Sequence, residues 1–350
     1  MQRAVACGHK FSVFVSEEGH AYACGSNEFG QLGFGAGKQT VFVPKRIGRL
    51  YQEQISFVSC GSNFAVCVDT SGQVYTFGES KNGSLGYEPT SLQESSVPKR
   101  IDLPPVLYAS CGTAHTLCVT NDSSLWSFGA NNYGQLCLGH KNDVNEPTQT
   151  SYSDVKSIVC GGQYSIILTN CGDLLGAGHN DMGQLGMEGN IIETPTTIPL
   201  SNIKSVSCGY YHTLFLDMDG NVFSTGHNNW GELGLGHNSD NPAVSTRVPI
   251  LENITSISCG ICHSMAIDMN GGLWMFGYNA QGQLGLDTKE PVYTPTRVPL
   301  KEEVCATSSG GHHTIVKCYN GSVYAMGYND SGQLGFRGEA ISPQAWNEES

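Results

Sequence analysis

The stretch from Cys259 to Gly285, CGICHSMAIDMNGGLWMFGYNAQGQLG, decides the fold because the motifs at its two ends return throughout the chain. It begins with a Cys-Gly pair and ends with the pattern Gly-x-Asn-x-x-Gly-Gln-Leu-Gly. In register with the repeat, the pair occurs six times and is Ser-Gly in a seventh copy; these copies begin at Cys7, Cys60, Cys111, Cys160, Cys208, Cys259 and Ser309. Successive copies lie 53, 51, 49, 48, 51 and 50 residues apart. Self-similarity at a nearly constant period is the signature of a repeat architecture.

The glycine-rich motif follows each Cys-Gly pair at a nearly constant distance. Its copies begin at Gly25, Gly78, Gly129, Gly178, Gly226, Gly277 and Gly327. A few positions depart from the pattern: Ser80, Ser84, Cys137 and Glu232. Two motifs that recur together seven times establish seven repeats.

Each repeat contains four short strand-like runs, which in the fifth repeat are 203–207, 212–216, 221–224 and 244–250. Four such strands in a unit of about 50 residues form one propeller blade. Several prolines fall near the fourth run: Pro44, Pro98, Pro195 and Pro249. Because proline cannot donate to a strand ladder, the fourth run is expected at the outer edge. The sequence therefore predicts an all-β fold, a seven-bladed β-propeller of four-stranded antiparallel blades, as a single domain over 1–350.

The two chain ends predict how the ring closes. The segments from the end of one glycine-rich motif to the next Cys-Gly hold 26, 24, 22, 21, 24 and 23 residues. Fifteen residues follow Gly335 and six precede Cys7, which together make 21. We therefore expect an N-terminal strand near 4–7 to join the blade of the last repeat, which would leave no unpaired sheet edge.

The combined pattern, Cys-Gly-x-x-His-Thr with Gly-x-Asn-x-x-Gly-Gln-Leu-Gly, resembles the regulator of chromosome condensation repeat family over the whole chain. The resemblance implies a seven-bladed propeller. It also implies one alternative function, nucleotide exchange on the small GTPase Ran. In that family the exchange activity uses a wedge-like insertion in one blade, and docking on chromatin uses a basic tail. Neither feature is evident here: the longest repeat exceeds the shortest by only five residues (53 against 48), and no lysine/arginine cluster is longer than Lys99-Arg100.

Light sensing, a third function found among similar propellers, requires clustered tryptophans and arginines after the Cys-Gly pairs. This chain has four tryptophans, at Trp126, Trp230, Trp274 and Trp346. Two of them are expected in third strands as packing residues, so the sequence does not favour a photoreceptor.

Composition excludes several classes of partner. The formal net charge is −13, which disfavours binding to nucleic acid or to an anionic membrane surface. The first sixteen residues lack the pattern of a signal peptide, and no apolar run reaches the roughly 20 residues of a membrane helix. Fourteen cysteines without a secretory signal indicate reduced thiols. We expect a cytoplasmic protein, with the nucleus as the alternative.

No set of residues predicts catalysis, a cofactor or a metal. The Cys-Gly positions are interpreted as small residues near the ring axis, without the Cys-x-x-Cys partners of a zinc site. Four residues after each first motif position stands a ring side chain: Phe11, Phe64, His115, Tyr164, His212, His263 or His313. We expect half-buried rings whose polar edges bond neighbouring backbone. The motif asparagines, such as Asn279, are expected to bond their own turns.

The predicted function is that of a non-catalytic protein-interaction scaffold. The two residues after each Cys-Gly should form a ring of loops at one mouth of the central channel. Most of these pairs are small or polar, but Tyr210, Tyr211, Ile261 and Cys262 would form a contiguous apolar arc on neighbouring blades. Together with His9, Lys10 and His312 they are the candidate residues for binding a protein partner. The alternatives are that the arc folds inward as packing, or that the site lies in the longer loops after Gly33 and Gly86.

Overall fold

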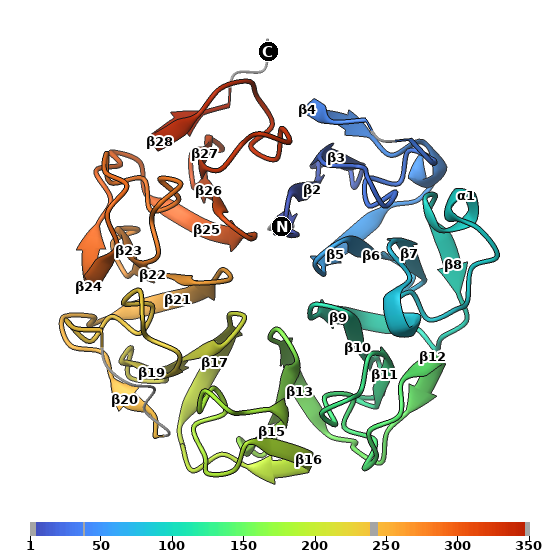
Figure 1. Ribbon diagram of the computed structural model, residues 1–350, viewed down its shortest axis with the longest axis horizontal. Helices are drawn as coiled ribbons and strands as arrows, with labels where there is room; N and C mark the ends of the chain where they lie inside the picture. The colour runs from blue at the N-terminus through green and yellow to red at the C-terminus, as the bar shows by residue number, and fades with distance from the viewer. Residues whose placement is uncertain (1–4, 38, 239–243, 347–350) are drawn as a thin grey trace.

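The computed structural model describes residues 5–37, 39–238 and 244–346, whose strands β1 to β28 form seven antiparallel sheets arranged in a ring (Figure 1). Each sheet is one blade of four strands, so blade 1 is β1–β4 and blade 7 is β25–β28. The predicted seven-bladed, all-β propeller is confirmed.

The innermost strands are β1 Val5–Cys7, β5 Ile55–Cys60, β9 Val106–Cys111, β13 Val155–Cys160, β17 Ile203–Cys208, β21 Ile254–Cys259 and β25 Val304–Ser309. The second strands are β2 Phe11–Val15, β6 Phe64–Asp69, β10 His115–Thr120, β14 Tyr164–Thr169, β18 His212–Asp217, β22 His263–Asp268 and β26 His313–Cys318. The third strands are β3 Ala21–Gly25, β7 Val74–Gly78, β11 Leu125–Gly129, β15 Leu174–His179, β19 Val222–Gly226, β23 Leu273–Gly277 and β27 Val323–Gly327.

The outermost strands are β4 Val41–Arg46, β8 Lys99–Ile101, β12 Val144–Gln149, β16 Ile191–Thr197, β20 Thr246–Arg247, β24 Val292–Arg297 and β28 Ala340–Ala345. Five of them contain a proline, as the edge position allows: Pro44, Pro147, Pro195, Pro295 and Pro343. Three single-turn helices lie in the connections: η1 Gly48–Leu50, η2 Lys81–Gly83 and α1 Leu92–Ser95. None of the helices in the described ranges is long and apolar enough to cross a membrane.

The prediction that the two chain ends share one blade is wrong. Strand β1 pairs with β2 of its own blade, from Val5 opposite Phe14 to Cys7 opposite Ser12, and blade 7 is complete without it. Ala4 lies outside the described residues. The segment between two motifs contains the last strand of one blade and the first strand of the next. The break between the chain ends falls between these two strands, so β28 stays in blade 7 and β1 belongs to blade 1. The ring closes by packing of blade 7 against blade 1.

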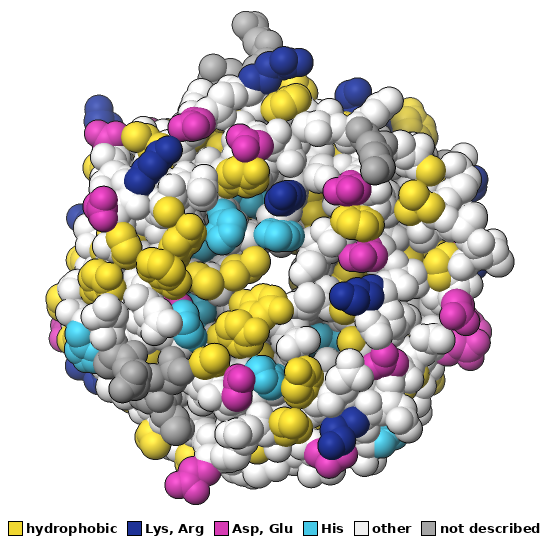
Figure 2. Space-filling view, in the orientation of Figure 1, with side chains coloured by type: hydrophobic (Ala, Val, Ile, Leu, Met, Phe, Trp, Pro, Cys, Tyr) yellow, Lys and Arg dark blue, Asp and Glu magenta, His cyan; other side chains and the backbone are white. Residues whose placement is uncertain are grey.

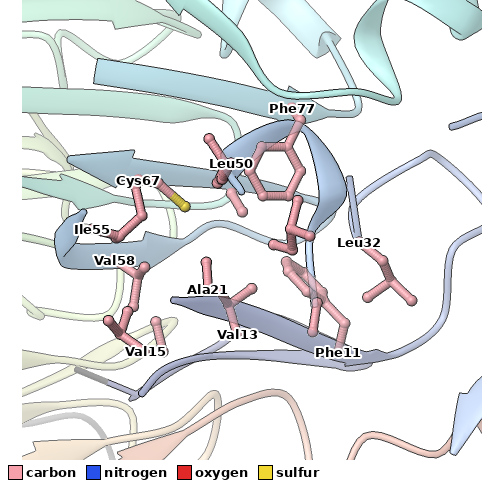
Figure 3. Packing of buried hydrophobic residues seen from close by; sticks show 14 of the residues in the cluster. Phe11, Val13, Val15, Ala21, Leu32, Leu50, Ile55, Val58, Cys67 and Phe77 are labelled. Atoms are coloured by element: carbon pink, nitrogen blue, oxygen red, sulfur yellow. The ribbon is translucent and has the colours of Figure 1, made fainter. Parts of the chain in front are cut away.

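The core lies between the blades. Where blade 1 faces blade 2, Phe11 and Val13 of β2 meet Cys67 of β6 and Phe77 of β7, with Leu50 of η1 covering them (Figure 3). Similar clusters of buried residues fill the other seams. All fourteen cysteines are unpaired.

The ring side chain that begins each second strand explains both motif glycines. In blade 6, a Cβ on Gly260 would overlap the imidazole of His263. On the next strand, Gly277 lies directly opposite His263 with φ +105°, and a Cβ there would lie 2.9 Å from the Cα of His263. Only glycine accepts both the positive φ and the close approach. The glycine of the Cys-Gly pair is therefore required by the ring side chain and not only by proximity to the axis.

These ring side chains are not half-buried, as the sequence suggested, but fully buried, and most of them bond a hydroxyl of the next blade. Five seams carry such a bond between 2.9 and 3.0 Å: His115–Ser165, Tyr164–Thr213, His212–Ser264, His263–Thr314 and His313–Ser12. The other two seams have Phe11 with Ala65 and Phe64 with Thr116 at the equivalent positions. The last of the five bonds joins blade 7 to blade 1, so it contributes to ring closure.

The hydroxyl determines which ring nitrogen carries the proton. Ser264 Oγ donates to the backbone oxygen of Glu232 at 2.7 Å, so toward His212 Nε2 it can only accept. The proton therefore resides on Nε2 of a neutral imidazole. Burial lowers the pKa of His212 to about 4. The same arrangement recurs at the other histidine seams.

The structure predicts that the two members of such a pair depend on each other. Ser264→Ala alone should lower the free energy of unfolding by about 1–3 kcal/mol, because it leaves the buried Nε2–H of His212 unpaired. Adding His212→Phe should cause no further loss of stability and should restore part of what Ser264→Ala removed. The double variant then carries the same apolar pair as the first seam, Phe11 with Ala65. Urea unfolding of the two single variants and the double variant measures this coupling. Strictly additive losses would contradict the proposed bond.

Candidate functional site

The loops that follow the seven Cys-Gly pairs surround the central opening on one face. Three residues from each loop line a cavity of about 180 Å³, beginning with Cys, or with Ser309 in blade 7. Backbone bonds connect neighbouring loops around the mouth, as from His9 N to the oxygen of Ser62 at 3.0 Å and from Tyr210 N to the oxygen of Ile261 at 3.2 Å. Six of the seven seams have such a bond; in the described ranges, the seam from blade 6 to blade 7 is the one without. The mouth is therefore a rigid frame.

The loops of the glycine-rich motif lie beside this frame and hold their own shape. In blade 6, Asn279 Oδ1 accepts from Leu284 N at 3.0 Å and Nδ2 donates to the oxygen of Thr288 at 2.8 Å. The equivalent asparagine–leucine bond occurs in every blade except blade 2, where Ser80 replaces asparagine. The expectation that these asparagines bond their own turns is confirmed.

We call Tyr210, Tyr211, Ile261 and Cys262 the mouth arc. All four side chains are half-buried. Tyr210 and Ile261 line the opening, and the rings of Tyr210 and Tyr211 meet edge to face with centroids 4.4 Å apart. Figure 2 shows hydrophobic side chains gathered on one side of the opening, with histidine and lysine side chains next to them. The arc is thus partly turned inward and partly accessible.

Tyr211 stands between two histidines that the sequence analysis did not select. Its ring centroid lies 6.0 Å from that of His179 and 6.5 Å from that of His227. Each histidine bonds a carboxylate, His179 that of Asp181 at 3.2 Å and His227 that of the buried Glu232. Burial raises the pKa of Tyr211 to about 12, so its hydroxyl remains protonated and able to donate.

A second group of aromatic residues extends the surface toward blade 7. Trp230, a residue that is 41% exposed, meets Tyr278 at a ring-centroid distance of 5.2 Å. Tyr278 in turn meets His312 at 5.3 Å, and His312 meets His9 at 6.2 Å. The aromatic surface therefore runs without interruption from blade 5 to blade 1.

A signal for the residues that were missed was present in the sequence. The residue between Gly and Asn in the second motif is histidine or tyrosine in blades 4 to 7, namely His179, His227, Tyr278 and Tyr328. In blades 1 to 3 it is Ser26, Glu79 and Ala130. Both motifs supply ring side chains in blades 5 and 7, so this side of the mouth is built by both.

Across the described part of the chain, no group of three or more His, Cys, Asp and Glu side chains is arranged to hold an ion. Burial raises the pKa of the channel cysteines; that of Cys259, for example, rises to about 12. The thiol of Cys259 donates to the backbone oxygen of Ser207 at 3.3 Å. These thiols are protonated packing groups and not nucleophiles.

Comparison with known proteins agrees with this geometry. The model of the RCC1-like domain matches residues 2–240, and models of the regulator of chromosome condensation (RCC1) repeat match 219–267, 270–316, 254–283 and 304–333. The chain belongs to the RCC1 repeat family. The propeller described above is the fold that its sequence repeats predict.

Relatives of this RCC1-type propeller include proteins of several kinds. The ultraviolet-B receptor UVR8 of Arabidopsis thaliana is 31% identical over 81% of this chain and 66% of its own length. The probable E3 ubiquitin-protein ligase HERC3 of Homo sapiens is 34% identical over 81% of this chain and 28% of its own length. The serine/threonine-protein kinase Nek9 of Xenopus laevis is 32% identical over 53% of this chain and 21% of its own length. The chain thus spans between one fifth and two thirds of the length of these relatives.

Solved structures show the same fold. Human WBSCR16 superposes with a TM-score of 0.82 at 25% identity, covering 90% of this chain and 86% of the other. Yeast RCC1 (Prp20), in a structure bound to Kap60, superposes with a TM-score of 0.86 at 18% identity, covering 99% and 85%. As predicted, Trp126 and Trp274 lie on the third strands β11 and β23.

Proposed function

We propose that this propeller is a non-catalytic protein-interaction module whose partner docks on the mouth arc. The observation that carries the proposal is the asymmetry of the mouth. On the side of blades 5 and 6 the loops present Tyr210, Tyr211 and Ile261, while the equivalent positions in blades 2 and 3 carry Ser62 and Thr113. Half-buried tyrosines held on a rigid frame supply contact area at little cost in side-chain entropy, which is why such residues anchor interfaces.

The rest of the structure supports an interaction role over an enzymatic one. RCC1-like propellers are mainly regulatory, and the kinase and ligase relatives are much longer than the part that this chain matches. Among the described residues that line the opening, the structure shows no nucleophile hydrogen-bonded to a base. We expect the partner to be a protein of the cytoplasm or, alternatively, the nucleus.

A differential capture experiment tests the proposal. The chain, the double variant Tyr210→Ala with Tyr211→Ala, and the control double variant Ser62→Ala with Thr113→Ala are each used to capture proteins from a lysate, followed by quantitative mass spectrometry. We expect one or more proteins to be retained by the parent chain and the control and lost by the tyrosine variant. The same proteins captured equally by all three baits would argue against the mouth arc.

Nucleotide exchange on a small GTPase is the alternative that the family raises. One similar structure, that of Prp20p of Saccharomyces cerevisiae, is described together with its binding to Gsp1p and histones, but at 20% identity it shows the fold alone. A nucleotide-release assay with Ran separates the two functions directly. The interaction module should leave release at the intrinsic rate, whereas an exchange factor would accelerate it.

A further inference from the structure

A group of basic side chains, His9, Lys10 and His312, adjoins the mouth arc at the seam between blades 7 and 1; we call it the basic cluster. The ring centroids of His9 and His312 lie 6.2 Å apart, and Lys10 Nζ lies 5.8 Å from the centroid of the Tyr328 ring. His312 also meets Tyr278, whose backbone N donates to the oxygen of Cys262 in the arc. The basic cluster and the arc therefore form one continuous surface.

The basic cluster forms no ion pair with a described carboxylate. Within the described ranges, no ion pair joins any of its three side chains to a carboxylate, and Nδ1 of His312 is buried without a hydrogen-bond partner. Burial lowers the pKa of His9, and Lys10 lowers it further. The pKa of His312 is lowered by burial and then by His9 and Lys10. Three basic groups are thus held together without an ion pair among the described residues, and the lowered pKa values favour the neutral forms of both histidines when no anion is bound.

Three carboxylates close to the mouth are in the opposite situation. Asp181 bonds His179, the buried Glu232 bonds His227, and Glu79 accepts from Asn63 at 3.0 Å. In a chain of net charge −13, the basic cluster is therefore a local exception to an acidic molecule. Electrostatic complementarity favours an anionic group at this place and disfavours a cationic one.

We propose that the basic cluster binds a side-chain carboxylate of an acidic segment of the partner protein, while apolar side chains of that segment lie on the mouth arc. The proposal rests on the docking function above and adds the chemistry of the partner. A protein segment fits better than a nucleic acid, because Lys10 is the one lysine of the basic cluster and a phosphate backbone is bound through several cations. The adjoining surface of Tyr278 and Ile261 fits apolar side chains.

Such binding is expected to take up protons. The groups that face the site are His9, Lys10 and His312, together with Tyr278, Tyr328 and the carboxylate of Asp330, which lies beside the Tyr328 hydroxyl. A carboxylate placed between the two imidazoles favours their protonated forms, so their pKa values rise on binding. Affinity should therefore increase as the pH falls from 8 to 6, a range in which the carboxylates of the partner remain ionised.

The test uses the full chain and three short fluorescent peptides in which leucine and tyrosine alternate with aspartate, with asparagine or with lysine. In fluorescence anisotropy titrations, we expect the acidic peptide to bind at least tenfold more tightly than its asparagine analogue, and the lysine peptide more weakly than either. Lys10→Gln and His312→Gln should each weaken the acidic peptide by at least fivefold and leave the asparagine peptide unchanged. Lys81→Gln, which removes the same charge elsewhere on this face, is the control and should change nothing.

Three results would overturn the proposal: equal affinity for the acidic and lysine peptides, insensitivity to both Lys10→Gln and His312→Gln, or tighter binding of single-stranded DNA than of the acidic peptide. A captured partner separates this failure from failure of the docking function. If partner binding is lost with the tyrosine variants but is unaffected by Lys10→Gln and His312→Gln, the mouth arc stands and the acidic chemistry is wrong. If neither set of variants weakens the partner, both proposals fail.

Discussion

Lowering the pH from 7 to 5 should destabilise this propeller by several kcal/mol, before most carboxylates are protonated. Burial lowers the pKa of His115 and His212 to about 4, and of His263 and His313 to about 3. In the unfolded chain the same histidines titrate near 6.5, so between about 6.5 and 4 the unfolded state binds more protons than the folded state. Stability is therefore complete above pH 6.5 and is lost as the pH falls, by about 1.5 kcal/mol per histidine down to pH 5. The lowered pKa values of His9 and His312 act in the same direction, to a smaller extent because these rings are more exposed.

Urea unfolding at a series of pH values measures this loss. The double variant His212→Phe with Ser264→Ala is the matched control, since it reproduces the pair that the first seam already carries in Phe11 and Ala65. This variant should remain folded at pH 7 and should lose about one quarter of the pH dependence of the free energy of unfolding that the four buried histidines contribute. A free energy of unfolding that stays constant from pH 7 to pH 5 would show that the histidines are not buried as neutral rings.

Trp346→Ala should destabilise the propeller by about 2–4 kcal/mol, more than any change on the mouth arc, because it removes a contact that closes the ring. The Trp346 ring packs edge to face on Phe14 of blade 1, with centroids 4.5 Å apart, and its Nε1 donates to the oxygen of Leu334 at 2.6 Å. At the equivalent place other blades carry an aliphatic residue such as Ile47, Ile198 or Val298. The tryptophan therefore fills the seam where no strand is exchanged.

Thermal and urea unfolding give the size of this effect, and hydrogen exchange gives its location. Protection should fall first in β1, β2 and β28. Trp346→Phe, which keeps a ring against Phe14 but loses the Nε1 bond, should cost about 1 kcal/mol. Trp230→Ala, at the exposed mouth, is the control. Equal losses for Trp346→Ala and Trp230→Ala would mean that Trp346 does not close the ring.

The repeat predicted the fold because each copy shows its four strands through short-range patterns. Turn glycines, edge prolines and alternating apolar residues act within one blade. Ring closure was predicted incorrectly for a geometric reason. The 21 residues shared by the chain ends are compatible with a division inside a blade or between two blades, and only the pairing of Val5 with Phe14 decides between them.

The candidate site was predicted in part. The repeat predicted that Tyr210 and Ile261 lie at one mouth of the channel, because equivalent positions in a closed ring must lie on one face. The contribution of His179 and Trp230 was missed, since it depends on loops of neighbouring blades meeting across a seam. The buried bond from His212 to Ser264 was missed for the same reason: the partners are 52 residues apart and belong to different repeats.

The affinity of a captured partner for Tyr210→Ala and Tyr211→Ala tests the central claim most directly. Titration calorimetry of each variant, with the melting temperature as a check on folding, provides the measurement. The docking site on the mouth arc predicts binding at least tenfold weaker for each variant, about 1.4 kcal/mol or more, at a nearly unchanged melting temperature. Unaltered affinity in both variants would contradict it, make the mouth arc a packing feature, and move the site to the longer loops after Gly33 and Gly86.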